Sequence, residues 1–266
     1  SIFGFDWRKN LEESAVRLAN TIRARAGRTT HPLPLIAHSQ GSLVARRALQ
    51  LLGPDLARQL VSHLVLLGPA TYGTFSAVFA IAGSHETIET IRKWGVKLPN
   101  HFEKILQSFT GLYQLVPWKK RDATSSVDTD RFKKPSFWAT GADESRLEFG
   151  FAWAERIDSR FFDDRTTIIL GDARTISDVQ WNGDKLVESA HTTKGDGTVP
   201  DVWARLAGVR TYRSAKTTHS GLPMSGTVRS AILSILTNGT PKLVRASGAK
   251  ADDVPTLRPL EQPQPR

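Results

Sequence analysis

The sequence predicts an α/β protein built on a doubly wound, mostly parallel sheet. Short apolar segments with the length of buried strands alternate with longer segments whose apolar residues recur at helical spacing. Strands that alternate with helices form parallel sheets with helices on both faces. The chain has 266 residues, of which 39% are hydrophobic and 23% charged, so it is long enough for one large domain with a sizeable core.

The elements follow from these patterns in chain order. The expected strands are Ile2–Phe5, Leu33–Ala37, His63–Leu67, Thr166–Leu170 and Val209–Tyr212. The first expected helix is capped by Asn10, with Glu13 as the reciprocal partner, and ends at Gly27. A second helix follows Ser39, runs to about Leu52 and ends at Gly53, and a last one spans about Ser225–Leu236. Asn182-Gly183 predicts a type I′ hairpin. Pro34 donates no backbone hydrogen bond and therefore fits poorly in a central strand.

Two segments interrupt the alternation, an aromatic insertion and a proline-rich tail. The insertion holds ten of the twelve phenylalanines and four of the seven tryptophans, with helices expected around His101–Leu112 and Leu147–Ile157. Its aromatic residues fit plain core packing, and they also fit a cap over a site. The tail fits a disordered segment or a linker to a further domain. The expected division is a core of residues 1–71 and 166–241, a cap insertion of residues 72–165 and a tail of residues 242–266.

Composition narrows the classes of partner. The formal net charge is +10, but the basic residues are scattered and no nucleic-acid motif accompanies them, so we expect no nucleic-acid partner. Most of these residues should form a solvated surface, which also favours peripheral contact with anionic membranes. No apolar run approaches the roughly 20 residues of a membrane span, and we expect no signal peptide within this stretch.

The start of the chain leaves localisation open. The chain begins at Ser1 and its only methionine is Met224, so we expect it to be a piece of a longer or processed product. The absence of cysteine excludes disulfides and thiol catalysis and is compatible with any redox compartment. We therefore expect a soluble protein, and the cytoplasm is weakly favoured as its location.

Ala37-His38-Ser39-Gln40-Gly41 carries the strongest chemical signal. This stretch stands where an apolar strand gives way to a helix, and the residues two positions before and after Ser39 are small. In a sharp strand-to-helix turn a serine takes strained backbone angles, which lift its hydroxyl above the sheet. Small neighbours are needed because larger side chains would collide with the turn. Ser39 is therefore the candidate nucleophile.

A serine hydroxyl becomes a good nucleophile when a histidine takes its proton and a carboxylate orients that histidine. With this topology the acid follows a late strand and the histidine follows the last one. Of the seven histidines, only His219 follows the last expected strand. Two carboxylates remain open as its partner: Asp196, between two glycines, and Asp172, directly after the fourth strand.

No cofactor is expected. The sequence contains no cysteine and no His-Glu-x-x-His, and no glycine-rich phosphate loop precedes a helix in the required register. A metal or a nucleotide is therefore not predicted, and the chemistry should rest on the side chains and backbone amides of the chain.

Four stretches carry a family resemblance. They are Phe5–Arg8, Leu66–Gly73, Leu112–Pro117 and Gly195–Pro200. They resemble motifs of the lecithin:cholesterol acyltransferase family of α/β-hydrolases. The first resembles the aromatic-Asp-Trp-Arg signature of that family, and the second its strand and glycine-rich turn after the nucleophile. The third resembles its cap motif, and the fourth its acid-bearing loop. The likeness extends from about Ile2 to Leu236, and the acid-bearing loop is its most specific part.

This resemblance implies an α/β-hydrolase-like fold with a helical cap and an esterase, lipase or acyltransferase acting on lipid-like esters. It implies Asp196 rather than Asp172 as the acid. The family carries about three strands before the region where this chain begins, and the loop after the third supplies an oxyanion amide. We therefore expect the first strands to be missing from this chain and the amide of Gln40 to be its oxyanion donor. The family usually has a glycine where this chain has Ser42, which should be harmless.

Two other hypotheses remain open at this stage. One is a catalytically weak or inactive module within a larger protein, which kept the fold and lost turnover. The other is a thioesterase or amidase that uses the same triad. Whether the acyl acceptor is water or an alcohol is not encoded in the motifs, because both reactions use the same residues.

Overall fold

The computed structural model describes residues 1–84, 102–118, 127–139, 141–157, 163–237 and 239–246. Its helices are α1 (Leu11–Ala26), α2 (Gly41–Leu52), α3 (Pro54–Leu60), α4 (Phe75–Ile81), α6 (Phe102–Gln107), α7 (Thr110–Tyr113), α8 (Glu144–Arg156), α9 (Asp201–Ala204) and α10 (Gly226–Leu236). Its strands are β1 (Leu33–His38), β2 (Val61–Leu67), β3 (Thr166–Leu170), β4 (Thr175–Asn182), β5 (Lys185–Thr192), β6 (Arg210–Arg213) and β7 (Val244–Arg245). Residue 101, parts of the expected cap and residues 247–266 of the expected tail lie outside the described residues.

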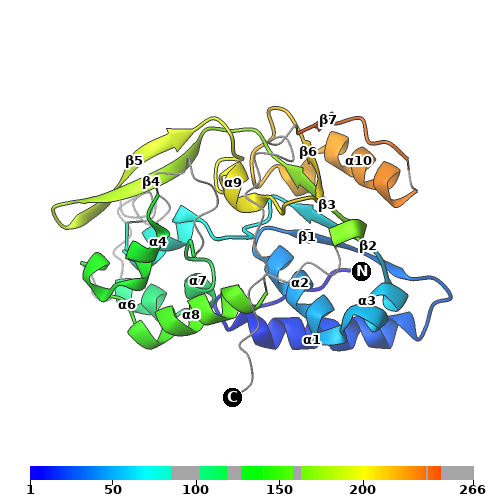
Figure 1. Ribbon diagram of the computed structural model, residues 1–266, viewed down its shortest axis with the longest axis horizontal. Helices are drawn as coiled ribbons and strands as arrows, with labels where there is room; N and C mark the ends of the chain where they lie inside the picture. Colours follow the sequence, from blue (N-terminus) through cyan, green and yellow to red (C-terminus); the bar gives the residue numbers. More distant parts are fainter. Residues whose placement is uncertain (85–101, 119–126, 140, 158–162, 238, 247–266) are drawn as a thin grey trace, which may run out of the picture.

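A five-stranded sheet with the order β1-β2-β3-β6-β7 forms the centre of the molecule (Figure 1). Its strands β1, β2, β3 and β6 are parallel, and β7 pairs antiparallel with β6. Strands β4 and β5 form a separate antiparallel hairpin that extends over α4. The predicted α/β class with a mostly parallel sheet is confirmed.

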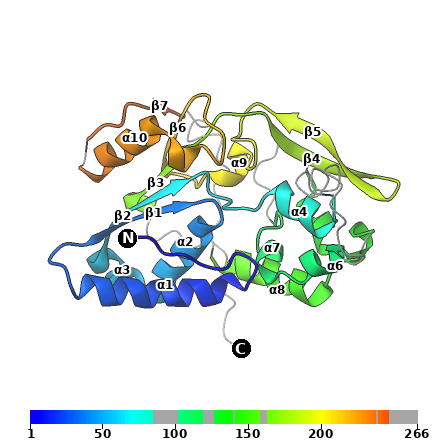
Figure 2. The ribbon, with the colours of Figure 1, turned by 180° about the vertical axis from the view of Figure 1, so that it is seen from behind.

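Helices cover both faces of the sheet, and the alternation of side chains along β2 shows why. Leu64 and Leu66 belong to the large core cluster that also contains the apolar residues of α1 and α2. Val65 and Leu67 belong to a second cluster with the apolar residues of α10. Because successive strand residues point to opposite faces, each face needs its own helical cover. Figures 1 and 2 show α1, α2 and α3 on one side of the sheet and α10 on the other.

β1 lies at the edge of the described sheet, and this position accounts for Pro34. The register between β1 and β2 shifts between Leu33 and Pro34. A proline costs little at an edge or at an irregularity, because no ladder hydrogen bond has to come from its nitrogen. The misfit expected for a central strand therefore does not arise.

The predicted strand Ile2–Phe5 is wrong. Phe3 and Phe5 pack against the large core cluster, as expected of a buried apolar segment, whereas Ile2 is 96% exposed. Among the described residues, however, no segment pairs its backbone with residues 2–5, and a strand requires such a partner. Figure 2 shows the segment running past α2 toward α7.

Helix α1 begins at the predicted cap but with a different second partner. The Asn10 side chain accepts a hydrogen bond from the amide of Glu12 at 3.0 Å. In place of Glu13, which is exposed, Gln114 completes the cap. Its Oε1 accepts from the amide of Leu11 at 2.8 Å and its Nε2 donates to Asn10 at 3.0 Å. A residue far along the chain thus helps to satisfy the free amides at the start of α1.

The connection between β2 and β3, residues 68–165, shares the core of the sheet. Phe75, Tyr113, Phe132 and Trp153 are at most 1% exposed and belong to the same cluster as the apolar residues of α1 and α2. The expected long helix that ends at Leu112 is instead two short helices, α6 and α7. For most aromatic residues of this connection, core packing is therefore the interpretation that the structure supports.

Gly111 gives a reason for the break between α6 and α7. A Cβ at this position would lie 2.1 Å from the carbonyl oxygen of Trp7, and the Gly111 amide donates to the carbonyl of Arg8 at 3.0 Å. Phe109, just before α7, has extended backbone angles, which turn the chain and bring Gly111 against the N-terminal segment. The contact with that segment therefore interrupts the helix.

The predicted hairpin is present, with its turn one residue further on. Asn182 pairs with Lys185, so the turn residues are Gly183 and Asp184. Gly183 has a φ of +62°, whereas Asp184 is not among the residues with positive φ. A type I′ turn needs positive φ at both central residues, so that part of the prediction is wrong.

The expected tail begins with a short strand. Val244–Arg245, which form β7, pair with Tyr212 and Arg213 of β6. The interpretation of residues 242–266 as a linker therefore does not hold for this pair. Within the described ranges, no helix is both long and apolar enough to cross a membrane.

Candidate active site

Ser39 lies in the sharp turn that the sequence predicts. It follows His38, the last residue of β1, and precedes α2, with a φ of +53°. Among the described non-glycine residues only Lys216 also has a positive φ. Such backbone angles cost of the order of 1–3 kcal/mol and persist only where the surroundings fix them. Here the Ser39 amide donates to the carbonyl of Leu67, at the end of β2, at 3.0 Å.

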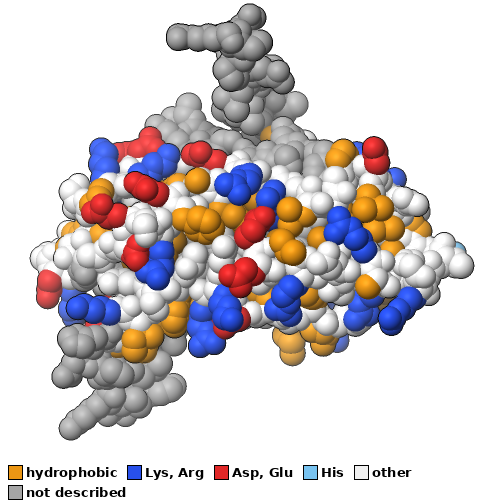
Figure 3. Space-filling model, turned by 90° about the horizontal axis from the view of Figure 1, so that it is seen from below, with side chains coloured by type: hydrophobic (Ala, Val, Ile, Leu, Met, Phe, Trp, Pro, Cys, Tyr) orange, Lys and Arg blue, Asp and Glu red, His pale blue; other side chains and the backbone are white. Residues whose placement is uncertain are grey.

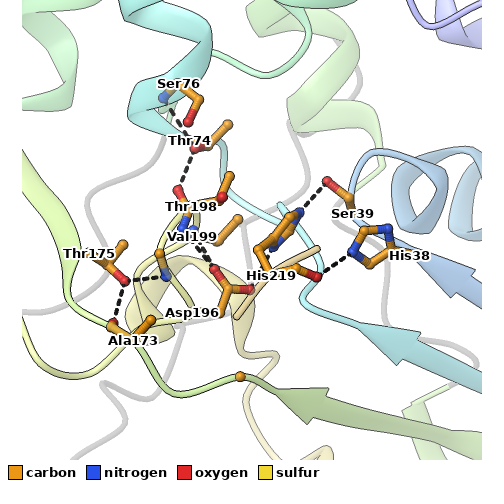
Figure 4. A network of polar contacts seen from close by, with 12 residues as sticks. His38, Ser39, Thr74, Ser76, Ala173, Thr175, Asp196, Thr198, Val199 and His219 are labelled. Carbon is orange, nitrogen blue, oxygen red and sulfur yellow. Dashed lines mark hydrogen bonds and ion pairs between the residues drawn. The ribbon is translucent and has the colours of Figure 1, made fainter. Parts of the chain in front are cut away.

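His219 lies between Ser39 and Asp196 (Figure 4). Its Nε2 is 2.8 Å from Ser39 Oγ, and its Nδ1 is 2.7 Å from Asp196 Oδ2. Ser39 follows β1, His219 follows β6, and Asp196 lies in the loop between β5 and α9. The structure thus brings the three residues singled out from the sequence into one hydrogen-bonded row at the carboxyl edge of the sheet, where α/β folds commonly hold their sites.

The Asp196 carboxylate is buried, and both of its oxygens accept hydrogen bonds. Asp196 is 2% exposed, and its Oδ1 accepts hydrogen bonds from the amides of Thr198 at 3.0 Å and Val199 at 2.8 Å. Hydrogen bonds to the charged form offset the cost of burying a carboxylate. Because an ionised carboxylate only accepts, Nδ1 of His219 must carry a proton. In a neutral imidazole Nε2 then lacks one and can take the proton of Ser39.

Two threonines fix the loop that carries Asp196 (Figure 4). Thr175 Oγ1, on β4, accepts from the amide of Gly197 at 2.8 Å and donates to the carbonyl of Ala173 at 2.8 Å. Thr74 Oγ1, just before α4, donates to the carbonyl of Thr198 at 2.7 Å. The loop is therefore held from the β4–β5 hairpin and from the β2–β3 connection.

Two glycines leave the space in which this row of residues forms. A Cβ at Gly68, whose φ is +48°, would lie 2.6 Å from Asp196 Oδ2 and 2.9 Å from His219 Nδ1. A Cβ at Gly171 would lie 2.3 Å from the carbonyl oxygen of Thr217. Sequence reasoning did not mark these glycines as part of the site. The available signal was their position, since each directly follows a strand of the sheet.

Asp172, the competing carboxylate, points elsewhere. Its Oδ2 accepts from the amide of Lys216 at 3.2 Å, and its own amide donates to the carbonyl of Thr217 at 2.7 Å. Both ring nitrogens of His219 are already engaged by Ser39 and Asp196. Asp172 therefore stabilises the loop that leads into His219 rather than orienting the imidazole.

Gln40 offers a backbone amide next to the serine. Among the hydrogen bonds between described residues, none uses this amide as donor. It stands at the N-terminus of α2, where amides and the helix dipole favour a negative charge. The Gln40 side chain is buried and donates to the carbonyls of Trp7 at 3.2 Å and Gly111 at 3.1 Å. These contacts fix the residue whose amide would meet an oxyanion.

The described part of the chain contains no group of three or more histidine, aspartate or glutamate side chains placed to hold a metal ion. The described side chains and amides that meet at this site are a serine hydroxyl, an imidazole, a carboxylate and the Gln40 backbone amide.

Comparison with known proteins relates the chain to others by fold. No protein-family model matches the chain, and no curated protein matches its sequence. Among solved structures, the Tle4–Tli4 complex matches with a TM-score of 0.54 at 14% identity, over 81% of this chain and 62% of that chain. The lipase BlEst2 of Bacillus licheniformis in its mature form gives a TM-score of 0.44 at 15% identity, over 80% and 69%. Phospholipase PlaB from Legionella pneumophila gives 0.36 at 16%, over 65% and 30%.

These identities show the fold alone. The chain shares its fold with the Tle4–Tli4 structure, and its own sheet makes that a mixed α/β fold with a mostly parallel central sheet. It spans 62% of the length of the chain in the Tle4–Tli4 complex. Activity, substrate and partners therefore have to be argued from the residues of this chain.

Proposed function

We propose that this protein is a serine hydrolase or acyltransferase that cleaves carboxylic esters through Ser39, His219 and Asp196. The observation that carries the proposal is the row of hydrogen bonds from carboxylate to imidazole to hydroxyl, 2.7 and 2.8 Å long. This geometry fits the roles of orienting acid, general base and nucleophile. The positive φ of Ser39 supports it, because such strain is typical of a nucleophile held above a sheet.

The proposed reaction begins when Ser39 Oγ attacks the ester carbonyl carbon. His219 Nε2 takes the hydroxyl proton, Asp196 stabilises the imidazolium, and the oxygen of the tetrahedral intermediate accepts from the Gln40 amide. Collapse of the intermediate breaks the bond to the alcohol, which leaves with the proton from His219, and an acyl group stays on Ser39. Water or an alcohol then attacks the acyl carbon, with His219 again as the base. The bond between the acyl group and Ser39 Oγ breaks as His219 returns the proton to that oxygen, which releases the acid or the new ester.

A lipid-like ester is the proposed substrate class. The four stretches similar to the lecithin:cholesterol acyltransferase family support it, and we propose that residues 72–165 form the cap over a core of residues 1–71 and 166–241. A contact supports that placement, since the buried Gln40 side chain next to Ser39 donates to the carbonyl of Gly111 within this segment at 3.1 Å. The cap would then be anchored beside the nucleophile.

Peripheral contact with an anionic lipid surface is part of the same proposal. The face formed by α1 and α8 mixes cationic and anionic side chains (Figure 3). The segment from Val202 to Ala246, by contrast, contains no acidic residue, and Arg210, Arg229 and Arg245 are exposed on β6, α10 and β7. A basic residue near an anionic membrane contributes about 1 kcal/mol. This end of the molecule therefore suits an anionic interface better than the α1–α8 face.

The hypothesis of a non-catalytic module has less support. A module that only binds would not need a serine hydroxyl within 2.8 Å of an imidazole, or a strained backbone to hold it there. A thioesterase or amidase remains a second candidate, because the same three residues serve all acyl transfers.

A fluorophosphonate probe tests the nucleophile. We expect the wild-type protein to be labelled covalently on Ser39 and Ser39→Ala to remain unlabelled. Ser230→Ala is the matched control, since Ser230 is exposed on α10 and has no part in the proposed mechanism. Labelling of wild type no faster than that of Ser39→Ala would contradict the assignment.

A substrate panel tests the reaction class. Matched p-nitrophenyl ester, thioester and anilide substrates with the same acyl chain should rank with the ester first. Preference for the thioester or the anilide would move the proposal to the second candidate, while the fluorophosphonate result would still hold.

A further inference from the structure

His38, the residue before the nucleophile, makes close contact with the proposed base. Its ring centroid lies 4.7 Å from that of His219, and its Nε2 lies 3.0 Å from the carbonyl oxygen of His219 (Figure 4). A carbonyl only accepts, so Nε2 of His38 must carry the proton and donate it. One side chain thus gives His219 both a packing surface and a hydrogen bond.

This contact completes the support of the His219 backbone. The His219 amide donates to the carbonyl of Asp196 at 2.7 Å, while the His219 carbonyl accepts from His38 at 3.0 Å and, at a longer 3.3 Å, from the amide of Leu222. The contact from His38 comes from β1, the strand that carries Ser39, whereas His219 follows β6. His38 therefore ties the loop of the base directly to the strand of the nucleophile.

The charge of His38 matters as much as its position. Among the described residues, the titratable groups that act on it are His219 and Asp196. Burial and the neighbouring His219 ring lower the pKa of His38, and together they outweigh the hydrogen bond to the His219 carbonyl and the charge of Asp196, which both raise it. At neutral pH His38 is therefore uncharged, so it donates its hydrogen bond without opposing the imidazolium that His219 must form.

We propose that His38 is a positioning residue for His219, which fixes the loop of the base relative to the strand that leads into the nucleophile. The inference rests on the proposed catalytic roles of Ser39 and His219. It makes two separable claims: that the donated hydrogen bond sets the rate, and that protonation of His38 suppresses it.

Two variants separate the hydrogen bond from the ring. His38→Phe keeps an aromatic ring against His219 but has no donor, whereas His38→Gln can place an amide nitrogen near the position of Nε2 and cannot titrate. With a p-nitrophenyl ester at pH 8, we expect His38→Phe to lower kcat about tenfold with KM within twofold. His38→Gln should keep kcat within about threefold. His63→Phe, a partly buried histidine on β2, is the matched control and should leave both unchanged.

The pH profile tests the second claim. A cation on His38 would oppose the imidazolium that His219 forms in the reaction. The acid limb of log(kcat/KM) should therefore have a steeper slope in the wild type than in His38→Gln, which cannot titrate at this position. A residue that merely supports the fold would not change this slope.

The proposal is overturned if His38→Phe retains wild-type kcat, if His38→Gln loses as much as His38→Phe, or if the acid limb keeps its slope. A proton NMR measurement separates this failure from a failure of the proposed function. The low-field resonance of the His219 Nδ1 proton, hydrogen-bonded to Asp196, should persist in His38→Gln and weaken or shift in His38→Phe whether or not the protein turns over an ester. An unchanged resonance in both variants would reject the positioning role even if Ser39 proved inactive.

Discussion

The carboxyl edge of the sheet and the β2–β3 connection are held together by different kinds of contact. At the sheet edge an imidazole is hydrogen-bonded to a buried carboxylate at 2.7 Å and to a hydroxyl at 2.8 Å. Gly68 has no side chain and so leaves room for the carboxylate and the imidazole. In the connection, aromatic rings such as Phe75 and Phe132 pack with their centroids 6.2 Å apart in the shared core. Directional contacts dominate one region and packing dominates the other.

The difference sets what a substitution should do in each region. A hydrogen-bonded row works only at one geometry, so a small displacement costs rate while the fold survives. An apolar core tolerates substitutions that conserve volume, and substitutions that disturb its packing lower the free energy of unfolding. We therefore expect substitutions at the sheet edge to lower activity at nearly constant stability. Substitutions in the connection should lower stability at nearly constant activity.

The largest expected effect separates the two carboxylates near His219. Asp196→Asn should put the wrong tautomer of His219 toward Ser39 and lower kcat by up to about 10⁴. Asp172→Asn should change kcat by less than threefold, since the Asp172 carboxylate contacts only the amide of Lys216 among the described residues. Steady-state kinetics with thermal unfolding of both variants checks the pair. The reverse order of losses would move the acid to the end of β3.

A glycine should have the next largest effect. Gly68→Ala would place a methyl group 2.6 Å from Asp196 Oδ2 at a φ of +48°, and the acid, the base or the loop must shift to relieve the clash. A displacement of about 1 Å in such a site costs about 10² in rate. Gly226→Ala is the control, because no atom lies within 4 Å of its added Cβ. Fluorophosphonate labelling rates measure the loss, and equal rates for both variants would show that the site does not need its directional geometry.

Regular strands and the order of the polar residues could be predicted from the sequence because both are local patterns. Thr166–Leu170 is a run of five buried apolar and β-branched residues, and its predicted bounds match β3. The positions of Ser39, Asp196 and His219 relative to the strands needed only the order of elements along the chain. The strand at Ile2–Phe5 was wrongly predicted because its pairing partner, unlike its side-chain pattern, is not a local property.

The remaining features depend on contacts between distant segments. Asp172 and Asp196 both follow a glycine and both lie in loops, so the residues themselves left the choice open. Only the fold shows that the amides of Thr198 and Val199 fix the Asp196 carboxylate toward His219. The completion of the Asn10 cap by Gln114 could not have been foreseen for the same reason, since the two residues meet only through the β2–β3 connection.

The smallest expected effect on activity tests a directional contact between α1 and the β2–β3 connection. Glu12 on α1 accepts from the Arg47 guanidinium of α2, with its closest contact at 2.7 Å, and from Trp153 Nε1 of α8 at 2.7 Å. Glu12→Gln should therefore leave kcat within twofold and lower the free energy of unfolding by about 1 kcal/mol at pH 7, because hydrogen bonds to a charged group are lost. Glu13→Gln, at an exposed neighbour, is the control.

The pH dependence of that loss has a definite sign. The Arg47 guanidinium holds the pKa of Glu12 below its ordinary value of 4.5, so folding favours the ionised carboxylate. The stabilisation is fully present above pH 4.5 and disappears as the pH falls through the lowered pKa of the folded state. Urea unfolding between pH 7 and pH 3 should show the difference between wild type and Glu12→Gln shrinking over the acid part of that range. A constant difference would mean that the stability lost in Glu12→Gln does not come from the charge of the Glu12 carboxylate.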